Sequence, residues 1–214
     1  MNPIQNAGGH VGITARDYPI AAATAIGAGA VVKLSEGLVV LALANETGAI
    51  LGIAAENHPG TTDPLNNRAD GKVISVFDNP ELVFECPAPT FAASGGTATT
   101  VTATTSEVAT TAADAFNGGY LVSPKGNRRR ITDFANSSST NTFTVESGET
   151  AASADVYTLY PQIGCAAGFR LDADNRSKIV LTATGMTKIK VVGHDYDRGM
   201  IKCMAVEHAL GVEN

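Results

Sequence analysis

The sequence predicts an all-β protein. Three observations support this fold class: short runs rich in β-branched residues, turn signals between these runs, and no stretch with a helical period over three turns. With 214 residues, the chain is long enough to bury a core without disulfide bonds or a structural metal. We expect a small β-barrel or β-tulip-like module, with a second small β module that could be inserted into the first.

The start of the chain differs from the rest. Residues 1–19 contain Gly and Asn without any periodic pattern. Pro3 and Pro19 bias the residues before them toward extended conformations. The sequence therefore predicts an extended N-terminal arm over residues 1–19.

The main β module is predicted over residues 20–92 and 163–214. Tight turns such as Ser35-Glu36-Gly37 separate its short apolar runs, which indicates a meander of antiparallel strands. The expected strands are Ala30–Leu34, Leu38–Ala44, Ile50–Ala55, Lys72–Phe77, Glu81–Cys86, Lys178–Thr182, Lys188–Val192 and Met200–Val206.

The composition changes at Ala92, and residues 93–162 are predicted to form the second, Thr/Ser-rich β module. Residues 97–112 contain eight threonines, which tolerate β geometry but bury little surface. Four strands are expected further along this module: Tyr120–Val122, Arg130–Phe134, Thr142–Glu146 and Asp155–Tyr160.

Charge and cysteine content limit the expected partners and location. The net charge of −6 and sequence pI of about 5.1 argue against nucleic-acid binding, for which a basic face is expected. Cys86, Cys165 and Cys203 have no metal-binding spacing, and we expect reduced thiols in a protein made in the host cytoplasm. Neither a signal peptide nor an apolar run of about 20 residues is visible, so no membrane partner is expected.

No motif in the sequence predicts catalysis, and we expect a protein that is not an enzyme and has no cofactor. The four histidines lie far apart, and P-loop, GxSxG and HExxH patterns are absent. Two acidic clusters, residues 172–175 and 194–197, could converge on a cation. We interpret both as solvated turns, and no metal site is predicted.

The run Arg128-Arg129-Arg130 has two open interpretations. It could dock on an acidic partner through bidentate hydrogen bonds. It could also be a charged strand edge that discourages unwanted pairing, which is the interpretation we favour.

Two parts of the chain carry a family resemblance. Gly29-Ala30-Val31-Val32-Lys33-Leu34, Gly37–Val40, Ile50–Ala54 and Gly71–Val76 follow one another in an order that resembles the β module of capsid decoration (cement) proteins of tailed bacteriophages. Residues 118–160 are similar to β segments of phage structural proteins.

The resemblance implies a virion protein that binds the outer face of the capsid shell and stabilises it. Its partner would be the major capsid protein, its oligomeric state a homotrimer, and its location the capsid surface. An arm that becomes ordered on docking would suit residues 1–19. The candidate capsid contacts are Ile4, His10, Arg16, Tyr18, Arg128, Arg129 and Arg130.

Two alternatives stay open at this point. The chain could be another virion component, such as a head-fibre, tail or baseplate protein. A carbohydrate-binding or hydrolytic β domain would need an aromatic groove and paired carboxylates, and the absence of Trp disfavours it.

Overall fold

The computed structural model describes residues 2–6, 14–21, 25–44, 46–60, 73–106, 108, 113–137, 139–165, 169–172, 179–181 and 188–210. None of these residues lies in a helix, and the all-β fold class is confirmed. The strands are β1 (Asn2–Asn6), β2 (Ala15–Pro19), β3 (Val31–Ser35), β4 (Leu38–Leu41), β5 (Gly52–Ala54), β6 (Val73–Phe77), β7 (Leu82–Pro87), β8 (Thr90–Ala92), β9 (Gly95–Gly96), β10 (Thr100–Thr104), β11 (Tyr120–Val122), β12 (Arg128–Asn136), β13 (Thr140–Val145), β14 (Val156–Tyr160), β15 (Phe169–Leu171), β16 (Ile179–Leu181), β17 (Ile189–Asp195) and β18 (Met200–Ala205).

A five-stranded sheet in the order β2-β6-β5-β3-β4 forms one end of the molecule. Ile20, the residue after β2, makes an isolated parallel bridge with Val39 of β4, so the two edges of the sheet approach each other. The sheet curls around an apolar core of its own that includes Val32, Leu51 and Ile74. Small side chains allow this tight curvature, but no sheet of the described residues closes into the barrel that the sequence suggested.

A four-stranded sheet in the order β1-β7-β18-β17 forms the middle of the molecule. Its core contains Phe84, Cys86, Ile201 and Cys203, and all three cysteines of the chain are free thiols. The hairpin β15–β16 packs against the same core through Leu171 and Ile179. The N-terminal strand β1 is an edge of this sheet.

A seven-stranded sheet in the order β8-β14-β11-β12-β13-β10-β9 forms the other end. Its two edge strands, β8 and β9, are separated in the chain only by residues 93–94. The inward side chains form a separate core with Phe91, Phe116, Phe134 and Phe143 at its centre. On β13 buried and half-buried residues alternate, as expected for a sheet with one solvated face.

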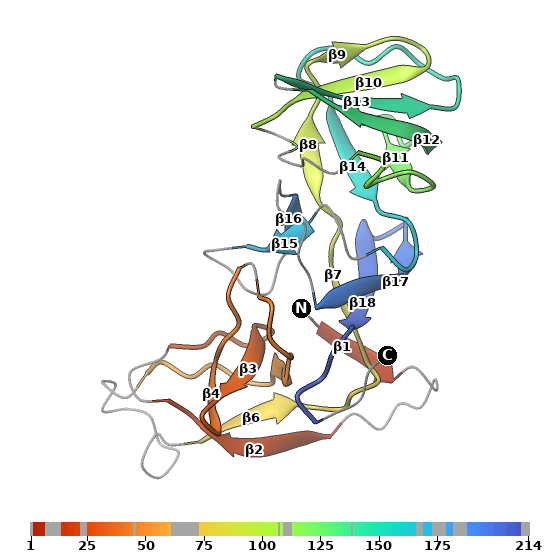
Figure 1. Ribbon diagram of the computed structural model, residues 1–214. Helices are drawn as coiled ribbons and strands as arrows, with labels where there is room; N and C mark the ends of the chain where they lie inside the picture. The colour runs from red at the N-terminus through yellow and green to blue at the C-terminus, as the bar shows by residue number, and fades with distance from the viewer. Residues whose placement is uncertain are drawn as a thin grey trace.

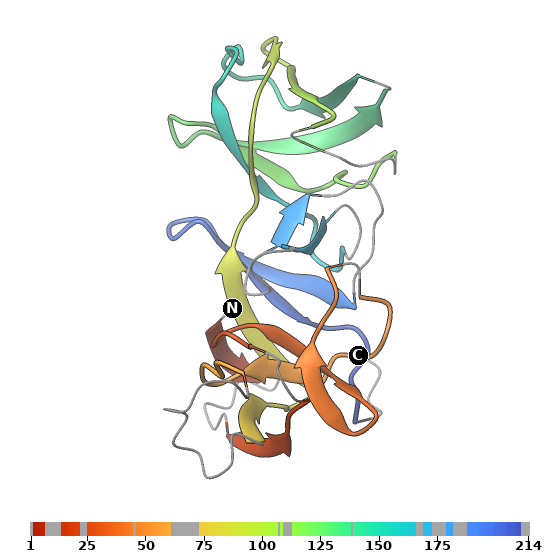
Figure 2. The ribbon, with the colours of Figure 1, turned by 90° about the vertical axis from the view of Figure 1, so that its left-hand side faces the viewer.

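The three sheets succeed one another along an elongated molecule (Figures 1 and 2). Strand β7 leads from the middle sheet into β8 of the seven-stranded sheet, and the chain returns after β14. All strands of the seven-stranded sheet come from residues 90–160. The division into a main module and an inserted module stays a prediction. The segment 90–160, which supplies this sheet, nearly coincides with the predicted second module, residues 93–162.

The predicted N-terminal arm is extended but paired. Residues 2–6 form β1 on β7, and residues 15–19 form β2 on β6. The described parts of residues 1–19 are therefore built into two sheets of the fold. Among the residues that the structure describes, no helix could span a membrane.

Candidate functional site

The most elaborate side-chain cluster lies at the waist of the molecule, where the turn between β17 and β18 meets the seven-stranded sheet. A β-bulge in β17 sets it up: Val191 lies opposite Cys203, but Gly193, and not Val192, lies opposite Lys202. The extra residue reverses the side-chain alternation, as bulges do. His194 therefore lies opposite the buried Ile201, on the face of the sheet that carries the core.

The imidazole of His194 has a defined hydrogen-bonding role. Its Nε2 lies 2.7 Å from the carbonyl oxygen of Pro161, which can only accept, so Nε2 carries the proton. Its Nδ1 lies 2.9 Å from the hydroxyl oxygen of Tyr196 and accepts a hydrogen bond from it. The rings of Tyr160 and Tyr196 flank the imidazole, with ring centroids 5.5 and 5.3 Å away.

Arg128 completes this cluster from the seven-stranded sheet. Its guanidinium carbon lies 4.4 Å from the centroid of Tyr196 and 5.3 Å from that of Tyr120. Such stacking is worth about 0.5–2 kcal/mol, depending on desolvation. We name Tyr120, Arg128, Tyr160, His194 and Tyr196 the waist cluster.

The electrostatics of the waist cluster favour the neutral form of His194. Burial lowers the pKa of His194 below its ordinary value, and the positive charge of Arg128 lowers this pKa further. The hydrogen bond to Pro161 acts in the opposite direction without reversing the shift. The unprotonated Nδ1 is what allows the bond from Tyr196.

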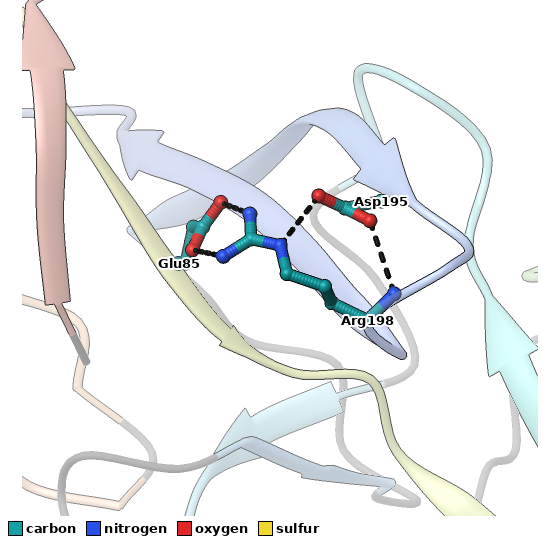
Figure 3. Close-up of polar contacts among 3 residues, drawn as sticks. All are labelled: Glu85, Asp195 and Arg198. Carbon is teal, nitrogen blue, oxygen red and sulfur yellow. Dashed lines mark hydrogen bonds and ion pairs between the residues drawn. The ribbon is translucent and has the colours of Figure 1, made fainter.

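The opposite face of the same turn is ionic (Figure 3). Arg198 donates from both terminal nitrogens to the carboxylate of Glu85 on β7, and its Nε donates to Asp195 at 2.8 Å. The backbone N–H of Arg198 also bonds Asp195, at 3.1 Å. Glu85 is only 4% exposed, so Arg198 neutralises a buried carboxylate, and together with Asp195 it fixes the turn to β7.

Arg129, beside Arg128, has a structural role. Its side chain is 4% exposed, and Nη1 donates to the backbone oxygen of Glu149 at 3.0 Å. Its Nη2 lies 3.3 Å from the hydroxyl of Tyr157. The guanidinium thus crosses the interior of the seven-stranded sheet and offers no surface to a partner.

Arg130 is exposed, as Arg128 is. It lines a shallow depression of about 400 Å³ together with Asn117, Gly118, Ile131, Thr132 and Gln162. The three consecutive arginines therefore have three different environments. Arg128, Arg129 and Arg130 pair with β11 on one side, and the pairing of β12 with β13 begins only at Ile131, so the interpretation of the run as a charged strand edge stays a prediction.

Arg16 and Tyr18 of β2 converge on one buried carboxylate. The hydroxyl of Tyr18 donates to Asp78, which is 3% exposed, and Nη1 of Arg16 lies 3.5 Å from the same carboxylate. Burial and the nearby Asp78 raise the pKa of Tyr18. A pocket of about 310 Å³ opens here, lined by Thr14, Arg16, Asp78, Asn79, Pro80 and Leu210.

Of the remaining candidate contacts, Ile4 lies in β1 and His10 lies outside the described residues. The sequence interpretation of residues 194–197 as a solvated turn is wrong for His194 and Asp195, which are both engaged. Of residues 172–175, only Asp172 is described. Within the described ranges, no group of three or more His, Cys, Asp and Glu could hold a metal ion.

The other described histidines have separate structural roles. His58 and His208 are each 3% exposed, and each Nδ1 accepts the backbone N–H of the residue two positions later, at 3.2 Å. Burial lowers the pKa of His208. Sequence reasoning could not distinguish these roles, because each depends on bridges between distant segments.

No family model, no curated protein and no solved structure matches this chain.

We expect Tyr196→Phe and Tyr196→Ala to separate the two contributions of this ring. The first variant removes only the hydrogen bond to His194 and should cost about 1 kcal/mol. The second also removes the stacking with Arg128 and Tyr160, and should cost about 2–3 kcal/mol. Chemical denaturation of both variants measures the difference, and equal losses would show that the ring contacts add nothing.

Proposed function

We propose that this chain is a structural protein of a bacteriophage particle that binds the outer face of the capsid shell and stabilises it. The observation that supports this best is a hydroxyl-lined sheet face at one end of an elongated molecule. This face belongs to the seven-stranded sheet, which forms one end of the molecule (Figure 1). Adhesion needs such a surface and no reacting group.

The hydroxyl-lined face is built from threonines that lie directly opposite each other. Strands β10 and β13 pair so that three threonines of one strand face three of the other, and all six alternate with buried residues. Cross-strand Thr pairs stabilise a sheet by roughly 0.2–1 kcal/mol each. We name this surface the threonine face: Thr100↔Thr144, Thr102↔Thr142 and Thr104↔Thr140.

A surface of this kind suits many weak contacts. A specific interface buries roughly 1,600 Å² in total, with hydrogen bonds distributed over it. If three copies are joined, as the trimer hypothesis states, their contacts act together and the combined affinity exceeds that of one copy. Threonine supplies both a methyl group and a hydroxyl group at low side-chain entropy cost.

The proposal is tested by sedimenting the full chain with purified empty shells of the encoding phage. We expect saturable binding with a fixed number of copies per shell. Thr102→Glu/Thr142→Glu should weaken binding tenfold or more, because buried unpaired charge in an interface costs a few kcal/mol. The matched control Thr90→Glu changes an exposed threonine of β8 and should bind normally. If the unmodified chain fails to sediment with the shells, the proposal is refuted.

If residues 1–19 were a free arm that becomes ordered on docking, their removal would weaken shell binding without affecting the fold. The structure changes this expectation, because the truncation removes β1 from β7 and β2 from β6. We now expect the truncated chain to lose stability as well, visible as a lower unfolding temperature. Arg16→Ala is the cleaner probe of this end, since the Arg16 side chain is 69% exposed.

The nearest alternative is another virion component, such as a head-fibre, tail or baseplate protein. It would use the same adhesive surfaces at a different place in the particle. Cryo-electron microscopy of particles that carry the protein distinguishes the two. Density on the shell surface supports the capsid role, and density confined to the tail or baseplate supports the alternative.

A further inference from the structure

We propose that the waist cluster is an acid-sensitive joint, in which protonation of His194 releases the seven-stranded sheet from the turn that fixes its orientation. The inference is independent of the proposed capsid role, since it concerns contacts within one chain. It follows from the different contacts that the ionic face and the aromatic face of the β17–β18 turn make.

The ionic face anchors the turn, and the aromatic face connects it to the other sheet. Glu85, Asp195 and Arg198 all belong to the four-stranded sheet or its turn, so their bonds keep the turn in place on β7. Tyr196 and His194, in contrast, contact residues that come from the seven-stranded sheet and the segment leaving it. Loss of the aromatic contacts would loosen the link between the two sheets without releasing the turn.

Protonation of His194 changes its hydrogen bonding and adds a charge. Nδ1 would become a donor, so the hydroxyl of Tyr196, 2.9 Å away, would have to turn and accept instead of donating. The new charge would also lie near Arg128, whose guanidinium is already stacked on Tyr196.

The other ionisable groups around His194 do not compensate for this charge. Asp195 is already engaged by Arg198, Asp197 is exposed, and burial raises the pKa of Tyr160 and of Tyr196, which favours their neutral forms. On β18, which pairs with β17 in the same sheet, Lys202 adds a further positive charge near Asp195.

The direction of the pH effect follows by linkage. In the closed joint the pKa of His194 is lowered, whereas a released imidazole has the ordinary value of about 6.5. The open form therefore binds more protons below this value, and acid favours opening. Each pH unit below 6.5 raises the ratio of open to closed joint by up to tenfold, until the pKa of the closed form is reached.

Backbone bonds limit how far the sheet can move. Ala88, in the segment entering β8, donates to the carbonyl of Gly199 at 2.9 Å, and Gly164 donates to Val191 at 2.7 Å. Two chain connections cross the waist, at residues 87–90 and 160–165. We therefore expect a rotation about these connections and not a separation of the sheets.

Hydrogen exchange of the full chain between pH 7.5 and 4.5 tests the joint, after correction for the intrinsic pH dependence of exchange. Protection of the backbone amides of residues 159–160, 162–165 and 194–199 should fall by up to tenfold per pH unit below 6.5. Amides of the core strand β13 should keep their protection. His194→Gln, which cannot titrate, should remove the pH response, whereas His208→Gln, at a buried histidine outside the waist cluster, should retain it.

An NMR titration of the imidazole Cε1–H signals of the unmodified chain supplies a second measurement that needs no variant. A pKa of His194 below 6.5 that matches the midpoint of waist opening supports the proposal. A pKa of 6.5 or higher, an unchanged response in His194→Gln, or simultaneous loss of protection in β13 would overturn it.

Discussion

Gly52→Ala should destabilise the five-stranded sheet by about 3 kcal/mol or more. A Cβ atom at Gly52 would lie 2.0 Å from the backbone oxygen of Phe77 and 2.9 Å from its carbonyl carbon. Because the obstacle is backbone, no change of rotamer relieves the clash, and β5 must move away from β6. A loss of this size lowers the unfolding temperature by roughly 10 °C in a chain of this length.

Gly193→Ala is the matched control for this substitution. A Cβ atom there would meet only side-chain atoms of Lys202, the nearest at 3.4 Å, which is ordinary van der Waals contact. We expect a change within about 1 kcal/mol, measured by thermal and chemical denaturation of both variants. A Gly52→Ala protein as stable as the Gly193→Ala protein would show that β5 and β6 do not approach as closely as described.

Phe143→Ala should cost about 4 kcal/mol, and the loss should be confined to residues 90–160. The ring is fully buried and lies 4.8 Å from the centroid of Phe134 and 5.1 Å from that of Phe91. Its removal leaves a cavity among large side chains that cannot easily collapse. Hydrogen exchange should therefore show loss of protection in the seven-stranded sheet, with the five-stranded sheet unchanged.

Val156→Ala controls for position in the same sheet, because Val156 is 53% exposed and should contribute little. The Phe143 experiment also tests whether residues 93–162 form a second module. If Phe143→Ala reduces protection equally in β3 and β13, the chain unfolds as one cooperative unit and the two-module interpretation is wrong.

Much of the fold could be predicted from local pattern. The runs at Ala30–Leu34, Lys72–Phe77 and Asp155–Tyr160 correspond to β3, β6 and β14 within a residue or two. In each case β-branched and aromatic residues lie between turn signals, so period and composition agree. Residues 100–104 were not predicted as a strand, because Thr and Ala give only a weak apolar signal and the core contacts of β10 come from its partners.

The candidate site could not be predicted, because it depends on a one-residue irregularity. Without the bulge between Val191 and Gly193, simple alternation would put His194 on the ionic face of the sheet. The different fates of Arg128, Arg129 and Arg130 likewise follow from strand pairing over long sequence distances. Among the candidate contacts that the structure describes, Arg16 and Tyr18 are brought together on Asp78, which sequence analysis did not single out.

The positions where the chain crosses the waist have a consequence for protein engineering and for evolution. Pro87 lies opposite Met200, Pro161 accepts from His194, and so the outgoing and returning crossings both adjoin one hairpin turn. A segment whose two ends lie so near each other can be replaced by a different segment without changing the path of the rest of the chain. Related chains could therefore carry unrelated cassettes at this point, and a foreign domain with closely spaced termini could be grafted there for display.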